Sequence, residues 1–373
     1  MLGILGGGQL GRYFVIAARV MGYRTMVLEP DPDAPAGAVA DVHLVAPYDD
    51  PAALQQMAEH CSVVTTEFEN PPASALHALA ATTPVRPSPA AIAIAQDRRI
   101  EKQFLADHGV PTAPFAIIDS ADDLHDHGIV FPAILKTARL GYDGKGQITV
   151  ADQQQLTDAW QSLHRVACVL EQRLQLQREV SVVLARSPDG HTAAYAVADN
   201  THVDGILDIT VVPARVAQSI ADNALGLAVT IATALDYVGV LAVEMFVVDG
   251  ALVVNELAPR PHNSGHWTLD AASTSQFEQQ VRAVCGLTLG DPSLGVPAVA
   301  MVNVLGDLWS GGEPRWQAAI DDPGAHLHLY GKRNPRPGRK MGHLTMTAPS
   351  IDEAASRALA CRVHARRDIQ LDH

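Results

Sequence analysis

The segment 241–266, LAVEMFVVDGALVVNELAPRPHNSGH, contains two apolar runs on either side of the dipeptide Asp249-Gly250. Leu241–Val248 and Ala251–Asn255 have the β-branched and aliphatic composition of strands, and Asp-Gly is a common hairpin turn. The hairpin would bring Glu244, within the first run, beside Glu256, directly after the second. The segment therefore predicts two adjacent antiparallel strands that carry a pair of carboxylates.

This carboxylate pair has two interpretations. A carboxylate in apolar surroundings is costly without a cation, and two acids beside the Asn255 amide are good oxygen ligands for Mg²⁺. The alternative is a structural pair between a glutamate and an arginine. His262 and His266 have the i,i+4 spacing of a zinc pair, but the prolines and the Ser-Gly between and before them argue against a helix. We therefore expect a substrate loop after the two carboxylates.

Upstream of the hairpin, the first hundred residues alternate apolar runs with helical patterns. Such alternation predicts parallel βαβ units, hence an α/β domain with a doubly wound sheet. A helix over Asp97–Gly109 then leads into a small α+β module, and long apolar strands follow, among them Val180–Ala185 and Thr192–Ala198. We expect an N-terminal domain over residues 1–96, a lid domain over 97–172 and a large domain over 173–373. The expected early strands and helices are Gly3–Leu5, Arg12–Met21, Thr25–Leu28, Ala52–Glu59 and Val63–Thr66.

Two glycine-rich loops could bind phosphate. Gly6–Gly11 satisfies G-x-G-x-x-G after a strand and before a helix, and Glu29 ends the next strand, as in dinucleotide-binding folds. The motif is weak alone, so NAD, another phosphate and a merely tight turn stay open. Gly141–Gln147 lies between two strands, five residues after Lys136. It suits a flap over a polyphosphate; the alternative is a hairpin with a solvated lysine.

Composition excludes several classes of function. The net charge of −14 argues against duplex nucleic acid, although a small anion can bind a few local cations. No apolar run approaches the roughly 20 residues of a transmembrane helix, and the first residues lack a secretory leader. Four widely spaced cysteines are typical of a reducing compartment. We therefore expect a cytoplasmic protein, with no membrane and no nucleic-acid partner.

A basic cluster follows the expected strand His326–Leu329. Five Lys or Arg residues fall within residues 332–340 of an otherwise acidic chain. The cluster is either a solvated loop or a clamp for an anionic substrate.

Taken together, these motifs resemble the ATP-grasp superfamily, and within it the N5-carboxyaminoimidazole ribonucleotide synthetase family. The resemblance covers nearly the whole chain. The segments NELAPRPHNSGH (255–266) and RPGRK (336–340) are its most specific parts, and the first glycine loop is the least specific. The matching segments are GGGQLGR (6–12), QDR (96–98), GYDGKGQ (141–147), EQRL (171–174), NELAPRPHNSGH and RPGRK.

The resemblance implies an ATP-grasp fold in which two domains clasp ATP. It implies that the nucleotide site is formed by Arg98, Lys136, Gly141, Tyr142, Asp143, Gly144, Lys145, Gly146, Gln147, Glu171, Gln172, Arg173, Leu174, Glu179, His202, Asn255 and Glu256. It places the ribonucleotide and bicarbonate against Gln9, Leu10, Glu67, Tyr142, Asp143, Arg260, His262, Asn263, Ser264, Lys332, Arg339 and Lys340. The residues assigned to the chemistry are Tyr142, Lys145, Arg260, His262 and Lys332.

The implied reaction couples bicarbonate to 5-aminoimidazole ribonucleotide at the expense of ATP, through carboxyphosphate, in purine biosynthesis. Glu244 and Glu256 would hold Mg²⁺, as two ions, with Mn²⁺ as an alternative, and a homodimer is expected. Lys145 stands where the family often has arginine, so bidentate binding is lost there.

Three other functions compete with this interpretation. A formate-dependent glycinamide ribonucleotide transformylase would have aspartate in place of Asn263 and a serine-rich flap. An NAD-dependent oxidoreductase explains only Gly6–Gly11 and Glu29. A non-catalytic nucleotide sensor needs neither the two acids nor the basic cluster.

Overall fold

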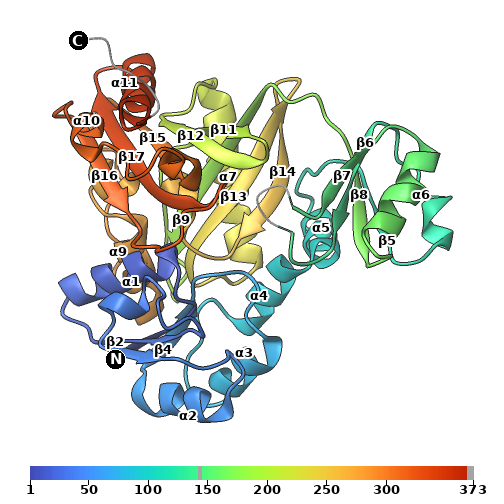
Figure 1. The fold of residues 1–373 in the computed structure, drawn as a ribbon. Helices are drawn as coiled ribbons and strands as arrows, with labels where there is room; N and C mark the ends of the chain where they lie inside the picture. Colours follow the sequence, from blue (N-terminus) through green and yellow to red (C-terminus); the bar gives the residue numbers. More distant parts are fainter. Residues whose placement is uncertain (142–144, 368–373) are drawn as a thin grey trace.

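The computed structural model describes residues 1–141 and 145–367, and within them the chain forms three β-sheets. Figure 1 shows the N-terminal sheet and its helices below the large sheet, with the small sheet projecting to one side. The three sheets follow one another along the sequence, and Val281 and Val284, far along the chain, join the core on one face of the N-terminal sheet.

The N-terminal sheet is parallel throughout, in the order β3-β2-β1-β4. Leu2 and Ile4 of β1 pack on one face against α1, whereas Leu5 packs on the other face against α2 and α3. Helices on both faces confirm the doubly wound α/β sheet. The elements are β1 (Leu2–Leu5), α1 (Gln9–Val20), β2 (Thr25–Leu28), β3 (Val42–Leu44), α2 (Pro51–His60), β4 (Val63–Thr66) and α3 (Ala73–Ala80).

Two helices, α4 (Pro89–Gln96) and α5 (Arg98–Asp107), connect this domain to the small sheet. The small sheet is antiparallel, in the order β5-β8-β6-β7. Asp152 caps α6 (Gln153–Ser162) by accepting a hydrogen bond from the Gln155 N–H. The strands are β5 (Phe115–Ile118), β6 (Ala133–Thr137), β7 (Gln147–Val150) and β8 (Cys168–Gln172).

The large sheet has nine strands, eight of them in the order β14-β13-β9-β11-β12-β15-β17-β16, and β10 pairs with β9. Helices α7 and α9 pack near its first strands, and α11 packs on β15 and β17. The strands are β9 (Arg178–Arg186), β10 (Thr192–Ala194), β11 (Ala198–Val203), β12 (Ile206–Val212), β13 (Gly239–Val248), β14 (Ala251–Ala258), β15 (Ala298–Leu305), β16 (Ala325–Leu329) and β17 (Lys340–Ala348). The helices are α7 (Gln218–Ala234), α8 (Thr268–Ala271), α9 (Gln276–Cys285), α10 (Trp316–Ala319) and α11 (Ile351–His364).

The predicted hairpin is present as β13 and β14. Asp249 and Gly250 form its turn with φ angles of 48° and 76°, a conformation that glycine adopts readily. Glu244 pairs directly with Glu256, and the register then shifts by one residue. The hairpin therefore places the two carboxylates side by side, as the sequence predicts.

No helix within residues 1–141 and 145–367 is long and apolar enough to cross a membrane.

Candidate active site

A cleft of about 1600 Å³ is lined by residues from all three sheets. Lys136 comes from β6, Glu171 from β8, Glu256 from β14, Glu67 from the end of β4 and Lys332 from the segment after β16. The cleft therefore collects side chains from nearly the whole length of the chain, from Gln9 at the start of α1 to Lys340 at the start of β17.

Most of the residues expected at the site line this cleft. Gly146 and Ser264 are not among the lining residues, and Tyr142, Asp143 and Gly144 lie outside the described residues. The expected residues that line it are Gln9, Leu10, Glu67, Arg98, Lys136, Gly141, Lys145, Gln147, Glu171, Gln172, Arg173, Leu174, Glu179, His202, Glu244, Asn255, Glu256, Arg260, His262, Asn263, Lys332, Arg339 and Lys340.

One wall of the cleft is built around Glu171. Its carboxylate lies 3.0 Å from the Lys136 Nζ and 3.3 Å from the Lys102 Nζ. Burial alone would raise the pKa of Glu171, but the two lysines hold it below its ordinary value. Burial lowers the pKa of Lys136, partly offset by Glu171. Lys102 also donates to the Asn255 carbonyl at 2.8 Å, so this wall connects β8 to β14.

The carboxylate pair already has cationic and hydrogen-bonding partners. Arg98 donates to Glu256 at 2.8 Å, so the glutamate–arginine alternative describes one of the two acids. Burial would raise the pKa of Glu256, yet the Arg98 charge and hydrogen bond lower it to about 2. Glu244 lies 3.0 Å from the His262 Nε2. Both carboxylates keep some exposure to the cleft, 15% for Glu244 and 38% for Glu256.

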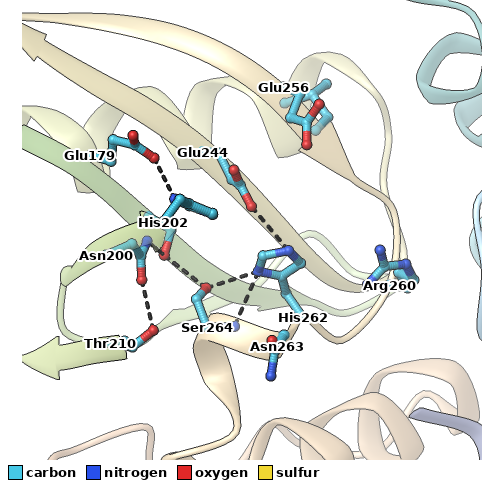
Figure 2. A network of polar contacts seen from close by, with 12 residues as sticks. Glu179, Asn200, His202, Thr210, Glu244, Glu256, Arg260, His262, Asn263 and Ser264 are labelled. Carbon is cyan, nitrogen blue, oxygen red and sulfur yellow. Dashed lines mark hydrogen bonds and ion pairs between the residues drawn. The ribbon is translucent and has the colours of Figure 1, made fainter. Parts of the chain in front are cut away.

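A buried hydrogen-bond network orients His262 (Figure 2). The Ser264 N–H donates to the His262 Nδ1, and the Ser264 Oγ lies 2.9 Å from the same nitrogen. Because Nδ1 accepts, the ring proton is on Nε2, which donates to Glu244. Ser181, 2.8 Å from Ser264, continues the network to Asn200. Ser264 therefore orients the His262 ring through hydrogen bonds and does not itself line the cleft.

The first glycine loop is occupied by carboxylates of the chain itself. The Gly8 and Gly11 N–H groups donate to Glu67 at 2.5 and 2.6 Å, and the Gly7 N–H donates to Glu29 at 2.8 Å. A Cβ at Gly8 would lie 2.5 Å from the Glu67 Oε1, so only glycine permits this approach. In a dinucleotide fold these amides would bind pyrophosphate. Their pairing with glutamates removes the structural basis for NAD.

The polar end of the cleft joins this loop to the basic cluster. Arg260 forms an ion pair with Glu69. Burial raises the pKa of Glu67, partly offset by its two amide donors. Lys332 donates to the Lys340 carbonyl at 2.8 Å, and Arg339 donates to the Asn334 carbonyl at 2.8 Å. These bonds fix the cationic segment at the rim of the cleft.

Sequence reasoning missed three charged residues here: Glu69, Glu101 and Lys102. Glu101 and Lys102 are 2% and 0% exposed, and they lie four and three positions before the buried Leu105 on α5. Charged residues on the apolar face of an amphipathic helix are a usable signal. Glu69 carries no such signal, because its partner Arg260 is distant in sequence.

The expectation against a zinc pair of His262 and His266 agrees with their separate surroundings. His262 contacts Glu244 in the cleft, whereas His266 is fully buried and its Nδ1 lies 3.1 Å from the Gln276 Nε2.

Comparison with known proteins assigns each part of the chain to a family. The ribonucleotide synthetase preATP-grasp domain matches residues 1–96, the ATP-grasp domain 103–277, and the phosphoribosylaminoimidazole carboxylase C-terminal domain 299–357. The N5-carboxyaminoimidazole ribonucleotide synthase of Brucella melitensis is 46% identical over 353 residues, which cover 93% of this chain and 96% of that protein.

Solved structures agree with this assignment. An ADP complex of an N5-carboxyaminoimidazole ribonucleotide synthetase has a TM-score of 0.92 at 39% identity, over 97% of this chain and 96% of the other. N5-carboxyaminoimidazole synthase from Aspergillus clavatus, in complex with ADP and 5-aminoimidazole ribonucleotide, has a TM-score of 0.89 at 30% identity, over 98% of each chain.

Proposed function

The chain belongs to the N5-carboxyaminoimidazole ribonucleotide synthases, and from this we propose how its cleft is divided among the substrates. The protein is an ATP-grasp ligase with N5-carboxyaminoimidazole ribonucleotide synthase activity in de novo purine biosynthesis, and it binds ATP. The transformylase, oxidoreductase and sensor alternatives are excluded by identity over nearly the full length.

ATP occupies the side of the cleft between the small sheet and the β13–β14 hairpin. Lys136, Arg98 and Lys145 supply positive charge there, beside the strand ends that carry Glu171 and Asn255. Phosphoryl transfer depends mainly on positioning and charge neutralisation, which fixed cations on rigid strands provide. The single observation that carries this assignment is the Lys136–Glu171–Lys102 cluster, which joins both walls of the cleft.

The aminoimidazole ribonucleotide and bicarbonate occupy the opposite end, between the first glycine loop and the basic cluster. Lys332, Arg339 and Lys340 suit a substrate phosphate, and Arg260 with His262 suits the anionic bicarbonate. Support comes from the Aspergillus clavatus enzyme, whose structure is a complex with both ADP and 5-aminoimidazole ribonucleotide. Tyr142, Asp143 and Ser264 remain proposed substrate residues on the family resemblance.

The donor set of β13 and β14 fits a magnesium ion. Glu244 and Glu256 are in register, both reach the cleft, and the Asn255 side chain lies beside them, 3.4 Å from Lys136. Carboxylate and amide oxygens are the ligands that Mg²⁺ prefers. Mg²⁺, or Mn²⁺ in its place, would neutralise phosphate charge when bound with ATP. Binding of Mg²⁺ requires the Glu256 carboxylate to be shared between the ion and Arg98.

The chain's own residues then direct the chemistry. Bicarbonate oxygen attacks the γ-phosphorus of ATP, giving ADP and carboxyphosphate, and the exocyclic amine of the ribonucleotide takes the carboxyl group with release of phosphate. Arg260, held by Glu69, binds and orients the anion. His262 donates from Nε2 toward the carboxylate side of the cleft. Lys332 donates to the Lys340 carbonyl at the same end of the cleft as Glu67, so its charge can stabilise the reacting carboxyl group.

We also propose domain boundaries after residues 96 and 172, a homodimer and a cytoplasmic location. The two domain boundaries are supported by the change from one sheet to the next after α4 and after β8. The dimer rests on the family resemblance and would show a molar mass of twice 39.7 kDa. The location is supported by four free cysteines.

Phosphate release from Mg-ATP tests the function directly. We expect release to depend on both 5-aminoimidazole ribonucleotide and bicarbonate, with carboxylated ribonucleotide formed in equal amount. Phosphate release that does not depend on both substrates contradicts the proposed reaction.

A further inference from the structure

A second group of metal-ligating side chains lies outside the cleft, where α8 meets β16 and β17. It consists of Asp270, His328 and His343, and one ligand atom from each lies within 4.8 Å of the other two. His328 and His343 are directly opposite each other in the β16–β17 ladder, so their side chains share one face of the sheet. None of the three lines the active-site cleft.

The Asp270–His328 contact already has the spacing of two ligands on one ion. The His328 Nε2 lies 2.9 and 3.0 Å from the two Asp270 oxygens. Neighbouring ligands of a tetrahedral zinc site with bonds near 2 Å are roughly 3.3 Å apart, so little movement is needed for this pair. Asp270 is 9% exposed and His328 is 22% exposed, so the pair opens to solvent on one side.

His343 supplies an independent observation. Its side chain is fully buried, its Nδ1 lies 3.0 Å from the Tyr330 hydroxyl, and its Nε2 has no hydrogen-bond partner. A buried nitrogen without a partner is costly and calls for an explanation. When Nδ1–H donates to the Tyr330 oxygen, the lone pair is on Nε2. This is the arrangement of a metal-bound histidine whose second nitrogen is held by a neighbour.

We propose that Asp270, His328 and His343 form a binding site for a transition-metal cation of the Zn²⁺ class, with a fourth position left to water. Imidazole and carboxylate donors suit Zn²⁺, whereas Mg²⁺ prefers oxygen alone. Coordination through the His328 Nε2 requires the ring proton to be on Nδ1, so the neutral ring takes this tautomer when the ion binds. The His328 and His343 rings, stacked 4.5 Å apart at 11°, must tilt so that each lone pair points at the ion.

The proposed site would fasten α8 to the two strands that flank the basic cluster. β16 ends three residues before Lys332, and β17 begins at Lys340. The ion would therefore stabilise the base of the substrate-binding segment without contacting substrate.

Calorimetric titration of Zn²⁺ into the full-length, chelator-treated protein tests the site. An excess of Mg²⁺ is included to compete at carboxylate sites, including Glu244 and Glu256. We expect one Zn²⁺ per chain, with binding weakened at least about tenfold in Asp270→Asn and in His328→Gln. Circular dichroism and ATP turnover check that both variants fold.

His191→Gln is the matched control, because His191 also pairs with an aspartate, Asp189, at 3.0 Å but has no third ligand within residues 1–141 and 145–367. We expect it to bind Zn²⁺ as the unmodified protein does. The proposal is overturned if the unmodified protein binds no Zn²⁺ in excess Mg²⁺, or if Asp270→Asn and His328→Gln bind it as tightly as His191→Gln. Either result leaves the cluster as a hydrogen-bonded contact between Asp270 and His328 beside the stacked His343 ring.

Discussion

Arg98 is the cation beside Glu256, and this single contact changes how the carboxylate pair is understood. The sequence predicted either a metal or an arginine as the partner of the carboxylates, but the structure allows Glu256 to interact with both. A carboxylate whose pKa is lowered to about 2 is fully ionised at neutral pH and can be shared. Glu244 differs, because its partner is the Nε2–H of His262 rather than a permanent charge.

The substitutions Glu244→Gln and Glu256→Gln should each abolish ATP turnover while the fold is retained. Each change removes one negative charge from the proposed Mg²⁺ site, and Glu256→Gln also leaves Arg98 without its carboxylate. ADP release at ordinary Mg²⁺ concentration, with circular dichroism as the fold check, measures the effect. Glu278→Gln is the control, since Glu278 pairs with Arg282 on α9 away from the cleft. Normal turnover in either test variant would falsify the metal assignment.

Lys332→Ala and Arg339→Ala should raise the KM for the ribonucleotide and leave the KM for ATP near normal. Each removes one charge-assisted contact, worth about 1.5–3 kcal/mol, or roughly ten- to a hundredfold in kcat/KM. Steady-state kinetics with each substrate varied separately give the answer. Arg333→Ala is the matched control, because Arg333 pairs with Asp33 and its side chain is 70% exposed. If ATP binding falls instead, the division of the cleft is wrong.

At the scale of elements, helix α5 connects the two walls of the nucleotide site. Its buried face carries Glu101, Lys102 and Leu105. The Leu257 N–H of β14 donates to Glu101 at 2.6 Å, and Lys102 reaches both Glu171 of β8 and the Asn255 carbonyl. A hydrophobic face alone would not fix these distances, so the hydrogen bonds and contacts of Glu101 and Lys102 determine where α5 lies.

Glu101 should make stability fall as the pH rises. Burial raises the pKa of Glu101 from 4.5 to about 8, despite the opposing charge of Arg98. Between these values the folded chain holds a proton that the unfolded chain has lost, so stability is greatest below pH 4.5 and is lost up to about pH 8. The change is on the order of a few kcal/mol. Urea denaturation of Glu101→Gln should lack this part of the pH dependence, and identical profiles in the two proteins would refute the assignment.

The elements also show what the sequence can predict. The β13–β14 hairpin was predictable because its turn and both strands are local. The expectation of a single strand over Thr192–Ala198 is wrong. β10 pairs Thr192 with Arg186 of β9, whereas β11 pairs Ala198 with Ser181 of β9, so the register on β9 shifts by one residue between them. That shift depends on β9, which periodicity within the segment does not reveal. The pairing of Gly8 with Glu67 is likewise set by the parallel sheet that places β4 beside β1.

At the scale of the whole molecule, the charges are unevenly distributed. The chain has a net charge of −14, yet the cleft is lined by Arg98, Lys136, Arg260, Lys332 and Arg339, among other cations. Both ATP and the ribonucleotide are anions, so they meet local positive charge inside an acidic protein. Arg98 and Lys136 belong to α5 and β6, whereas Arg260, Lys332 and Arg339 lie next to strands of the large sheet. Substitutions can therefore alter one half of the cleft at a time.

A crossed thermal-shift experiment tests this separation. A ligand at 100 times its Kd stabilises the folded state by about 2.7 kcal/mol, so loss of binding appears as loss of the ligand-induced rise in Tm. Lys136→Met should lose the rise caused by Mg-ADP, because it removes a buried cation that faces the phosphates, and should keep the rise caused by the ribonucleotide. Lys332→Ala should show the reverse pattern, each variant serving as the other's control. If both variants lose both rises, the cleft acts as one site and the proposed division fails. If neither changes, these two lysines do not bind the substrates.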